Sequence, residues 1–162
     1  MPLNWKNEDG RPAYPSHRTI AEWCRCLGVR CPPRRGWFRV PGTNRWLWFP
    51  HAEAAKWQNG YDQASGEIDE LFVGDEADRR NRTLLDAANR AKVEQGIGDV
   101  VSGREKERLV FFNDNRNAFG IPALENGYGF VGVFRIDPEK SRREGKCVYR
   151  RIADSVELPL NG

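Results

Sequence analysis

Histidine is scarce in this 162-residue sequence, which contains only His17 and His51. Neither lies in a recognisable catalytic motif, which excludes most histidine-based catalysis and any histidine-rich metal cage. Long hydrophobic runs are also missing, and the N-terminal residues lack the apolar core of a secretory signal. We therefore expect no membrane partner and a cytoplasmic location.

Cysteine is limited to four residues, of which Cys24, Cys26 and Cys31 lie close together in the sequence and Cys147 is distant. Their spacing lacks the paired C-x2-C motifs of structural zinc sites. On one helix, Cys24 and Cys26 would point about 200° apart. We expect reduced thiols and no metal site here.

Motifs for nucleotide cofactors and activated nucleophiles are absent. The glycine-rich positions near 42, 96 and 127 form neither a P-loop nor a dinucleotide fingerprint, and no serine lies on a glycine-flanked elbow. We predict no cofactor and no catalytic residues, and we favour a binding protein over an enzyme. The carboxylates between Glu67 and Asp78 leave a small metal-dependent nuclease as a third hypothesis, against the simpler interpretation of a solvated acidic linker.

The net charge is only +3, but the charges are unevenly distributed. Residues 11–60 carry nine Arg and Lys against two acids, residues 61–80 carry two against seven, and residues 104–151 carry eleven against seven. Arginine supplies most of the positive charge, and its planar guanidinium suits phosphates and base edges. This pattern favours DNA or RNA as the partner, although arginine-rich codon usage would give the same composition.

Local patterns predict an α+β protein. We expect a short helix that either Ser16 or Thr19 caps and that Gly28 ends, followed by a hairpin over residues 36–50. A helix from His51 to Gly60 should come next, and then a central helix from Asp78 to Gln95 that Gly96 and Gly98 end. Strands should follow at 99–103, 107–112, 129–136 and 146–152, as a C-terminal β-barrel or curved antiparallel sheet. The predicted units are residues 1–62, with the helix and hairpin, and residues 63–162, packed together as one compact domain.

The hairpin over residues 36–50 and the segment before it alternate cations with aromatic rings. This is the texture of a surface that follows phosphates and stacks on bases. The candidate contact residues are Arg34, Arg35, Arg39, Arg45, Trp37 and Trp46. The segment 17–60 resembles excisionase-type winged-helix proteins, but it has no room for a recognition helix between Val29 and Gly36. Core packing of one tryptophan face is the alternative interpretation.

The last third of the chain carries aromatic strands around a polar insert, in the order LVFF, NDNRN, GYGFVGVFRID and VYRRIAD. Over residues 104–157 this order resembles the PUA-like barrels of the SRA, EVE and ASCH type. The resemblance implies a pocket that holds an extruded base. The candidates for stacking are Phe112, Phe119, Tyr128 and Phe130, those for base-edge contacts are Asn113, Asp114, Arg116 and Asn117, and those for phosphates are Arg142, Arg143 and Lys146. A simple Asn-rich hairpin turn is the competing interpretation.

The leading hypothesis is a nucleic-acid-binding protein that reads a modified base or a single strand in a phage, mobile-element or defence system. The second is an interaction factor, such as a phage-encoded inhibitor, that binds a protein partner through the Trp-rich hairpin.

Overall fold

The computed structural model describes residues 1–10, 13, 18–32, 36–50, 56–62, 64–113 and 127–160. In chain order, its elements are β1 (Pro2–Asn4), α1 (Ile20–Leu27), β2 (Trp37–Arg39), β3 (Arg45–Trp48), β4 (Trp57–Tyr61), β5 (Ile68–Phe72), the 3-10 helix η1 (Asp78–Arg80), α2 (Arg82–Val101), β6 (Glu107–Phe112), β7 (Gly129–Ile136), α3 (Pro138–Glu144), β8 (Cys147–Ala153) and β9 (Ser155–Glu157).

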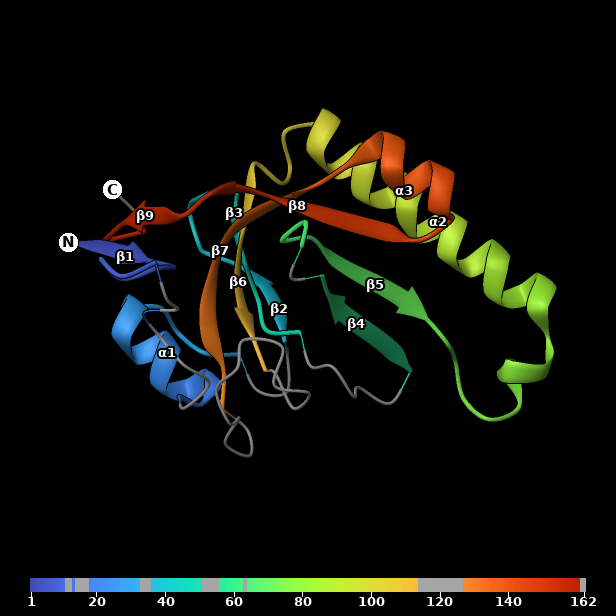
Figure 1. Ribbon diagram of the computed structural model, residues 1–162, viewed down its shortest axis with the longest axis horizontal. Coiled ribbons are helices and arrows are strands. Elements are labelled where there is room, and N and C mark those ends of the chain that lie inside the picture. Colours follow the sequence, from blue (N-terminus) through green and yellow to red (C-terminus); the bar gives the residue numbers. More distant parts are fainter. Residues whose placement is uncertain are drawn as a thin grey trace.

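One curved sheet of seven strands organises the molecule, in the order β2-β3-β6-β7-β8-β5-β4 (Figure 1). Its neighbours are antiparallel except for β3 and β6, which run parallel. A small second sheet pairs β1 with β9. Within the described residues, β2 and β4 are the two edges of this sheet. The sheet is curved, but because its edge strands do not pair with each other it is not closed into a barrel. The predicted α+β class with a curved sheet is confirmed.

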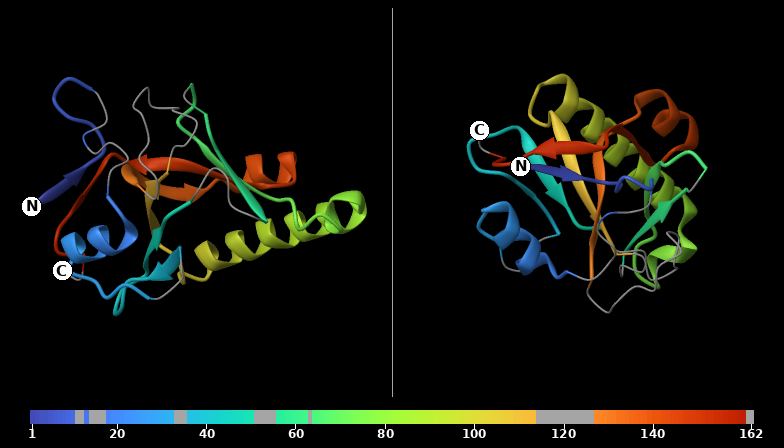
Figure 2. Two further views of the ribbon diagram at one scale, coloured as in Figure 1. Left: turned by 90° about the horizontal axis from the view of Figure 1, so that it is seen from below. Right: turned by 60° about the vertical axis from the view of Figure 1, so that its left-hand side comes forward.

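The helices cover both faces of this sheet. Trp23 of α1 packs on one face, with its ring 4.9 Å from that of Phe111. On the other face Gly96 of α2 lies against Ile136, and α3 lies beside α2. Figures 1 and 2 show α1 and the α2–α3 pair on opposite sides of the central strands β6 and β7.

The first helix follows the capping signals in its sequence. The Thr19 side chain accepts a hydrogen bond from the Glu22 N–H, and Gly28 ends the helix in the left-handed region, at φ 70°. The apolar stripe then buries Trp23 and Leu27 against the sheet. This predicted helix is confirmed, as is the hairpin, in which Trp37 pairs with Trp48 and Arg39 with Trp46.

The predicted helix over His51–Gly60 is wrong where the structure describes it. Trp57–Tyr61 is the strand β4, which pairs with β5 from Trp57–Phe72 to Tyr61–Ile68. Strand pairing with β5 therefore overrides the local helix propensity of these residues. Residues 56–60 do not form the helix that an excisionase-type protein would have after the hairpin. Residues 51–55 lie outside the described residues.

The central helix is longer than its glycines suggest. It runs from Arg82 to Val101, past Gly96 and Gly98, and occupies residues 99–101, where the sequence predicts the start of a strand. A Cβ added at Gly96 would lie 2.9 Å from the Ile136 side chain. Gly96 therefore lets the helix approach β7 closely instead of ending it.

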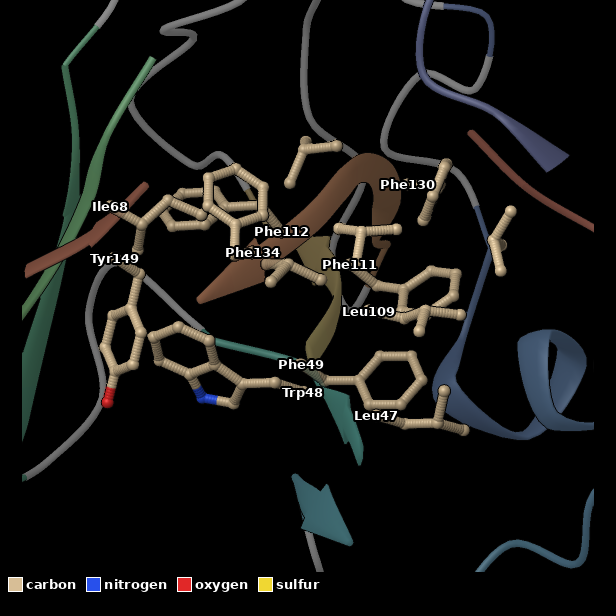
Figure 3. Close-up of a cluster of buried hydrophobic side chains, with 14 of the residues drawn as sticks. Leu47, Trp48, Phe49, Ile68, Leu109, Phe111, Phe112, Phe130, Phe134 and Tyr149 are labelled. Carbon is tan, nitrogen blue, oxygen red and sulfur yellow. The ribbon is translucent and has the colours of Figure 1, made fainter. Parts of the chain in front are cut away.

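The core has two layers of side chains because successive residues of a strand point to opposite faces of the sheet (Figure 3). On the α1 side, the Phe111 ring packs against Phe49 at 4.8 Å and Phe130 at 5.4 Å. On the α2 side, the Trp48 ring lies 4.9 Å from Tyr149.

A buried cation holds the α2 side together. The Arg108 guanidinium donates to both Glu105 carboxylate oxygens at 2.8 and 2.9 Å, and both residues are about 4% exposed. It also lies 4.9, 4.8 and 4.4 Å from the ring centroids of Trp37, Trp48 and Tyr149. Burial alone would lower the pKa of Arg108, but the nearby Tyr149 and Glu105 raise it, so the cation persists.

We predict that Arg108→Ala lowers the free energy of unfolding by about 3–5 kcal/mol, because it leaves the Glu105 carboxylate buried without a counter-charge. Urea denaturation measures the change. The double variant Arg108→Met with Glu105→Leu should recover most of it, since an apolar pair leaves no orphan charge. A decrease below about 1 kcal/mol for Arg108→Ala would contradict this role.

Candidate nucleic-acid interface

The strongest sign of a binding site is Asn113, directly after β6. Asn113 is 0% exposed, and its backbone N–H donates to the Pro50 carbonyl at 3.2 Å. Neither its Oδ1 nor its Nδ2 has a hydrogen-bond partner among the residues that the structure describes. An unsatisfied buried amide costs about 1–3 kcal/mol. A site that keeps such a group has donors and an acceptor ready for a ligand.

Tyr128 lies at the same end of the sheet as Asn113. The register of β6 and β7 ends with the pair Phe112–Gly129, so Asn113 and Tyr128 are the residues just beyond this end of the two strands. The Tyr128 backbone is held from both sides, since its N–H donates to the Arg18 carbonyl at 2.8 Å and its carbonyl accepts from Trp23 Nε1 at 2.7 Å. Its ring meets Phe49 edge-on at 5.6 Å. Burial raises the pKa of its phenol.

Arg18 brings positive charge to this end of the sheet. Its guanidinium lies 4.9 Å from the Trp23 ring centroid and donates to the Cys26 sulfur at 3.7 Å. Sequence reasoning missed Arg18 as a site residue because it precedes the first helix by two positions. Its proximity to Tyr128 comes from an isolated β-bridge that joins residues 110 positions apart.

The predicted stacking residues Phe112 and Phe130 both lie in the core. Phe130 is 0% exposed and packs against Phe111 (Figure 3), while the Phe112 ring lies 6.3 Å from that of Tyr61. In this conformation both rings belong to the packed core. Four further predicted pocket residues lie outside the described residues: Asp114, Arg116, Asn117 and Phe119.

The predicted phosphate contacts near the last strands are mostly engaged in ion pairs. Arg142 and Arg143 lie in α3, where Arg142 donates to both Glu94 oxygens at 2.9 and 3.0 Å, and Lys146 pairs with Asp69 at 3.1 Å. Arg143 is exposed and has no ion pair within the described part of the chain. Because α3 follows the end of β7 that is opposite Tyr128, Arg142 and Arg143 lie toward the other end of this strand from Asn113.

The hairpin residues are described from position 36 onward, so Arg34 and Arg35 lie outside the described residues. Arg39 is exposed, whereas Arg45 pairs with Glu107 and donates to the Leu160 carbonyl at 3.0 Å. Trp37 and Trp46 stack on each other at 4.5 Å, and both are partly buried.

The acidic stretch contributes a strand instead of a linker. Asp69 of β5 accepts from the Gly60 N–H at 2.9 Å in addition to Lys146, and Asp75 and Asp78 each accept from the other's N–H. In the described ranges, no group of three His, Cys, Asp or Glu residues could hold a metal ion.

Burial and the neighbouring Cys31 raise the pKa of Cys24 to about 12.

Fold and site together define a PUA-like domain with an unsatisfied polar group buried at one end of a curved sheet. A family model for the SET and RING associated domain, SRA, matches residues 16–158. The chain therefore belongs to the SRA family, and the predicted PUA-like resemblance is confirmed. Membership makes it a DNA-binding domain of the class that reads modified bases.

The solved structure of "The 5-Hydroxymethylcytosine-Specific Restriction Enzyme AbaSI" has a similar fold, with a TM-score of 0.57 and 18% sequence identity. The match covers 96% of this chain and 42% of that enzyme, so the chain spans less than half of the enzyme's length. No curated protein matches the sequence. Among the described residues, no helix is long and apolar enough to cross a membrane.

We predict opposite effects on stability for two buried asparagines. Asn113→Leu should leave the free energy of unfolding unchanged or raise it by up to about 3 kcal/mol, because it removes an unsatisfied amide. Asn89→Leu should lower it by about 1–3 kcal/mol, because the Asn89 amide bonds the Phe72 N–H, the Phe72 carbonyl and the Leu85 carbonyl. Urea denaturation of both variants measures the difference. Equal destabilisation would mean that Asn113 has a structural partner.

Proposed function

We propose that this domain binds duplex DNA, extrudes a cytosine modified at C5, and reads the base edge with the Asn113 carboxamide. The observation that carries the proposal is the fully buried side chain of Asn113, whose donors and acceptor are unused within the described residues. The bound base would supply the missing partners, so the cost of the unsatisfied amide in the free protein becomes affinity in the complex.

A carboxamide fits the Watson–Crick edge of cytosine. Its Oδ1 can accept from the exocyclic N4 amine, and its Nδ2 can donate to N3. Thymine presents a carbonyl and an N–H in these places, so it would face the amide with both polarities reversed. A carboxamide turned by 180° about χ2 would match thymine instead, so selection of cytosine requires neighbouring groups that hold the bound amide in the first orientation. The room available for a C5 substituent would decide between modified and unmodified cytosine.

The surroundings of Asn113 support base extrusion. Aromatic rings of Tyr128, Phe49 and Trp23 lie at this end of the sheet, and Arg18 adds a cation that can contact a phosphate beside the extruded nucleotide. Phe119, Asp114, Arg116 and Asn117 remain candidates from the sequence for the other side of the base.

The structural relative supports the choice of modified cytosine. It is named as a restriction enzyme specific for 5-hydroxymethylcytosine, and this chain matches 42% of it. We infer that the domain serves as the recognition part of a defence system that distinguishes modified from unmodified DNA.

We predict that Asn113→Leu removes the preference for modified DNA. Fluorescence anisotropy with matched duplexes, which carry 5-hydroxymethylcytosine, 5-methylcytosine or cytosine at one position, measures it. The wild-type domain should bind one modified duplex at least tenfold more tightly than the cytosine duplex, and the variant should bind all three alike. Asn89→Leu is the matched control and should keep the preference. A variant that retains full discrimination contradicts the role of Asn113.

Arg34 and Arg35 should contribute charge rather than sequence information. We predict that Arg34→Ala with Arg35→Ala weakens binding to every duplex and reduces the salt slope of log affinity by about 0.9 for each phosphate that the variant no longer neutralises. Arg142→Ala, which removes a side chain already bound to Glu94, should leave the slope unchanged. Anisotropy titrations over a range of salt concentrations decide, and an unchanged slope in the double variant would refute phosphate binding by these two arginines.

A further inference from the structure

A second concave surface lies on the α2 side of the sheet, between α2 and the β4–β5 hairpin. This α2–β4 groove encloses about 320 Å³ and is lined by Trp57, Phe72, Ala88, Ala91, Lys92 and Gln95. Strand alternation places Asn113 on the α1 side with Phe111, so the groove and the proposed base site lie on opposite faces of the sheet.

Lys92 is the charged residue of the groove. Its Nζ lies 4.8 Å from the ring centroid of Trp37 and 5.6 Å from that of Trp57, so it bridges the two edge strands β2 and β4. Cation–π contacts orient the ammonium but do not neutralise it. No carboxylate lies within 4.0 Å of Lys92 among the described residues.

One charged group of a neighbouring strand acts on Lys92. Glu70 of β5 attracts it, but the Glu70 carboxylate is engaged by the Tyr149 hydroxyl at 3.5 Å, and burial raises its pKa. Arg108 of β6, the other cation that acts on Glu70, is already paired with Glu105. Lys92 is therefore a fixed cation that Glu70 attracts at longer range, but that no carboxylate of the described residues approaches within salt-bridge distance.

The remaining walls are apolar and shallow. The ring centroids of Trp57 and Phe72 lie 5.0 Å apart, with an interplanar angle of 53°. On the helix side the lining includes the small side chains of Ala88 and Ala91. Leu84, one turn before Ala88 on the same side of α2, is 43% exposed and extends the apolar strip. Beside it, β4 has no strand partner on its outer edge within the described ranges.

We propose that the α2–β4 groove binds an acidic segment of a protein partner, which places an apolar or aromatic side chain on Trp57 and Phe72 and a carboxylate on Lys92. Charge complementarity favours this occupant, because the lining has one cation, which forms no salt bridge among the described residues, and otherwise apolar or amide groups. A nucleic-acid backbone needs a row of cations, which this lining does not supply. The surface goes beyond base recognition and would couple the reader to another polypeptide.

The test uses NMR spectra of the ¹⁵N-labelled full chain with two peptides. One peptide contains Glu-Asp-Phe-Glu-Leu, and the other has its acidic residues replaced by lysine. The acidic peptide should shift resonances of residues 84–95 and of β4, and the lysine peptide should not. Lys92→Gln should lower the affinity for the acidic peptide at least tenfold, and Ala91→Glu should abolish binding of this peptide. Arg90→Gln is the matched control, because Arg90 lies outside the groove lining on the same helix, and it should bind like the wild type.

Both groove variants should keep their affinity for modified DNA, which shows that they fold and separates this proposal from the base site. The proposal is overturned if millimolar acidic peptide shifts none of these resonances, if the lysine peptide binds equally well, or if Lys92→Gln binds unchanged. It is also overturned if a single-stranded oligonucleotide, or self-association of the chain, shifts the same resonances in the wild type and no longer does so in Lys92→Gln.

Discussion

The buried Arg108 guanidinium is the constraint on which the rest of the structure depends. It joins Trp37 of β2, Trp48 of β3 and Tyr149 of β8 around one cation, and Glu105 closes the arrangement from the turn before β6. Hydrogen bonds between strands hold neighbours together, whereas Arg108 of β6 also contacts β2 and β8, each of which is one strand removed from β6. It therefore ties together strands that backbone pairing does not join directly.

The end of β6 matters because we propose that Asn113 reads the base there. The pairing of β6 and β7 shifts at Val110 and Phe111, and Gly132 sits at this irregularity with φ 120°, where a Cβ would lie 2.8 Å from Arg151 Nε. A bulge of this kind re-aims the residues that follow it. Asn113 lies just beyond this irregular segment, and its buried amide, which has no hydrogen-bond partner among the described residues, is the group that the proposed base would satisfy.

Much of the fold could be predicted because its signals are local. Thr19 and Gly28 mark the ends of α1, the turn at residues 40–44 marks the hairpin, and the aromatic strands of the last third carry the PUA-like pattern. Asn113 is a candidate from the sequence alone, as part of the polar insert that follows an aromatic strand, and its buried amide keeps it a candidate in the structure.

The failures have a common cause in contacts between distant residues. β4 follows a helix-forming sequence but pairs with β5, and Gly96 looks like a helix end but packs against β7. The local sequence does not indicate that Arg142 forms an ion pair with Glu94 or that Arg18 forms a β-bridge with Tyr128. It also does not indicate that Arg108 is buried. Two of the predicted phosphate contacts, Arg142 and Lys146, form ion pairs with Glu94 and Asp69, which the fold brings beside them.

A crystal structure of the domain with a duplex that contains one 5-hydroxymethylcytosine tests base recognition by Asn113 most directly. We expect the modified base outside the helix stack, with its N4 amine and N3 within about 3.2 Å of Asn113 Oδ1 and Nδ2, respectively. A complex in which the base stays stacked in the duplex, or is extruded into a pocket that does not include Asn113, would contradict it.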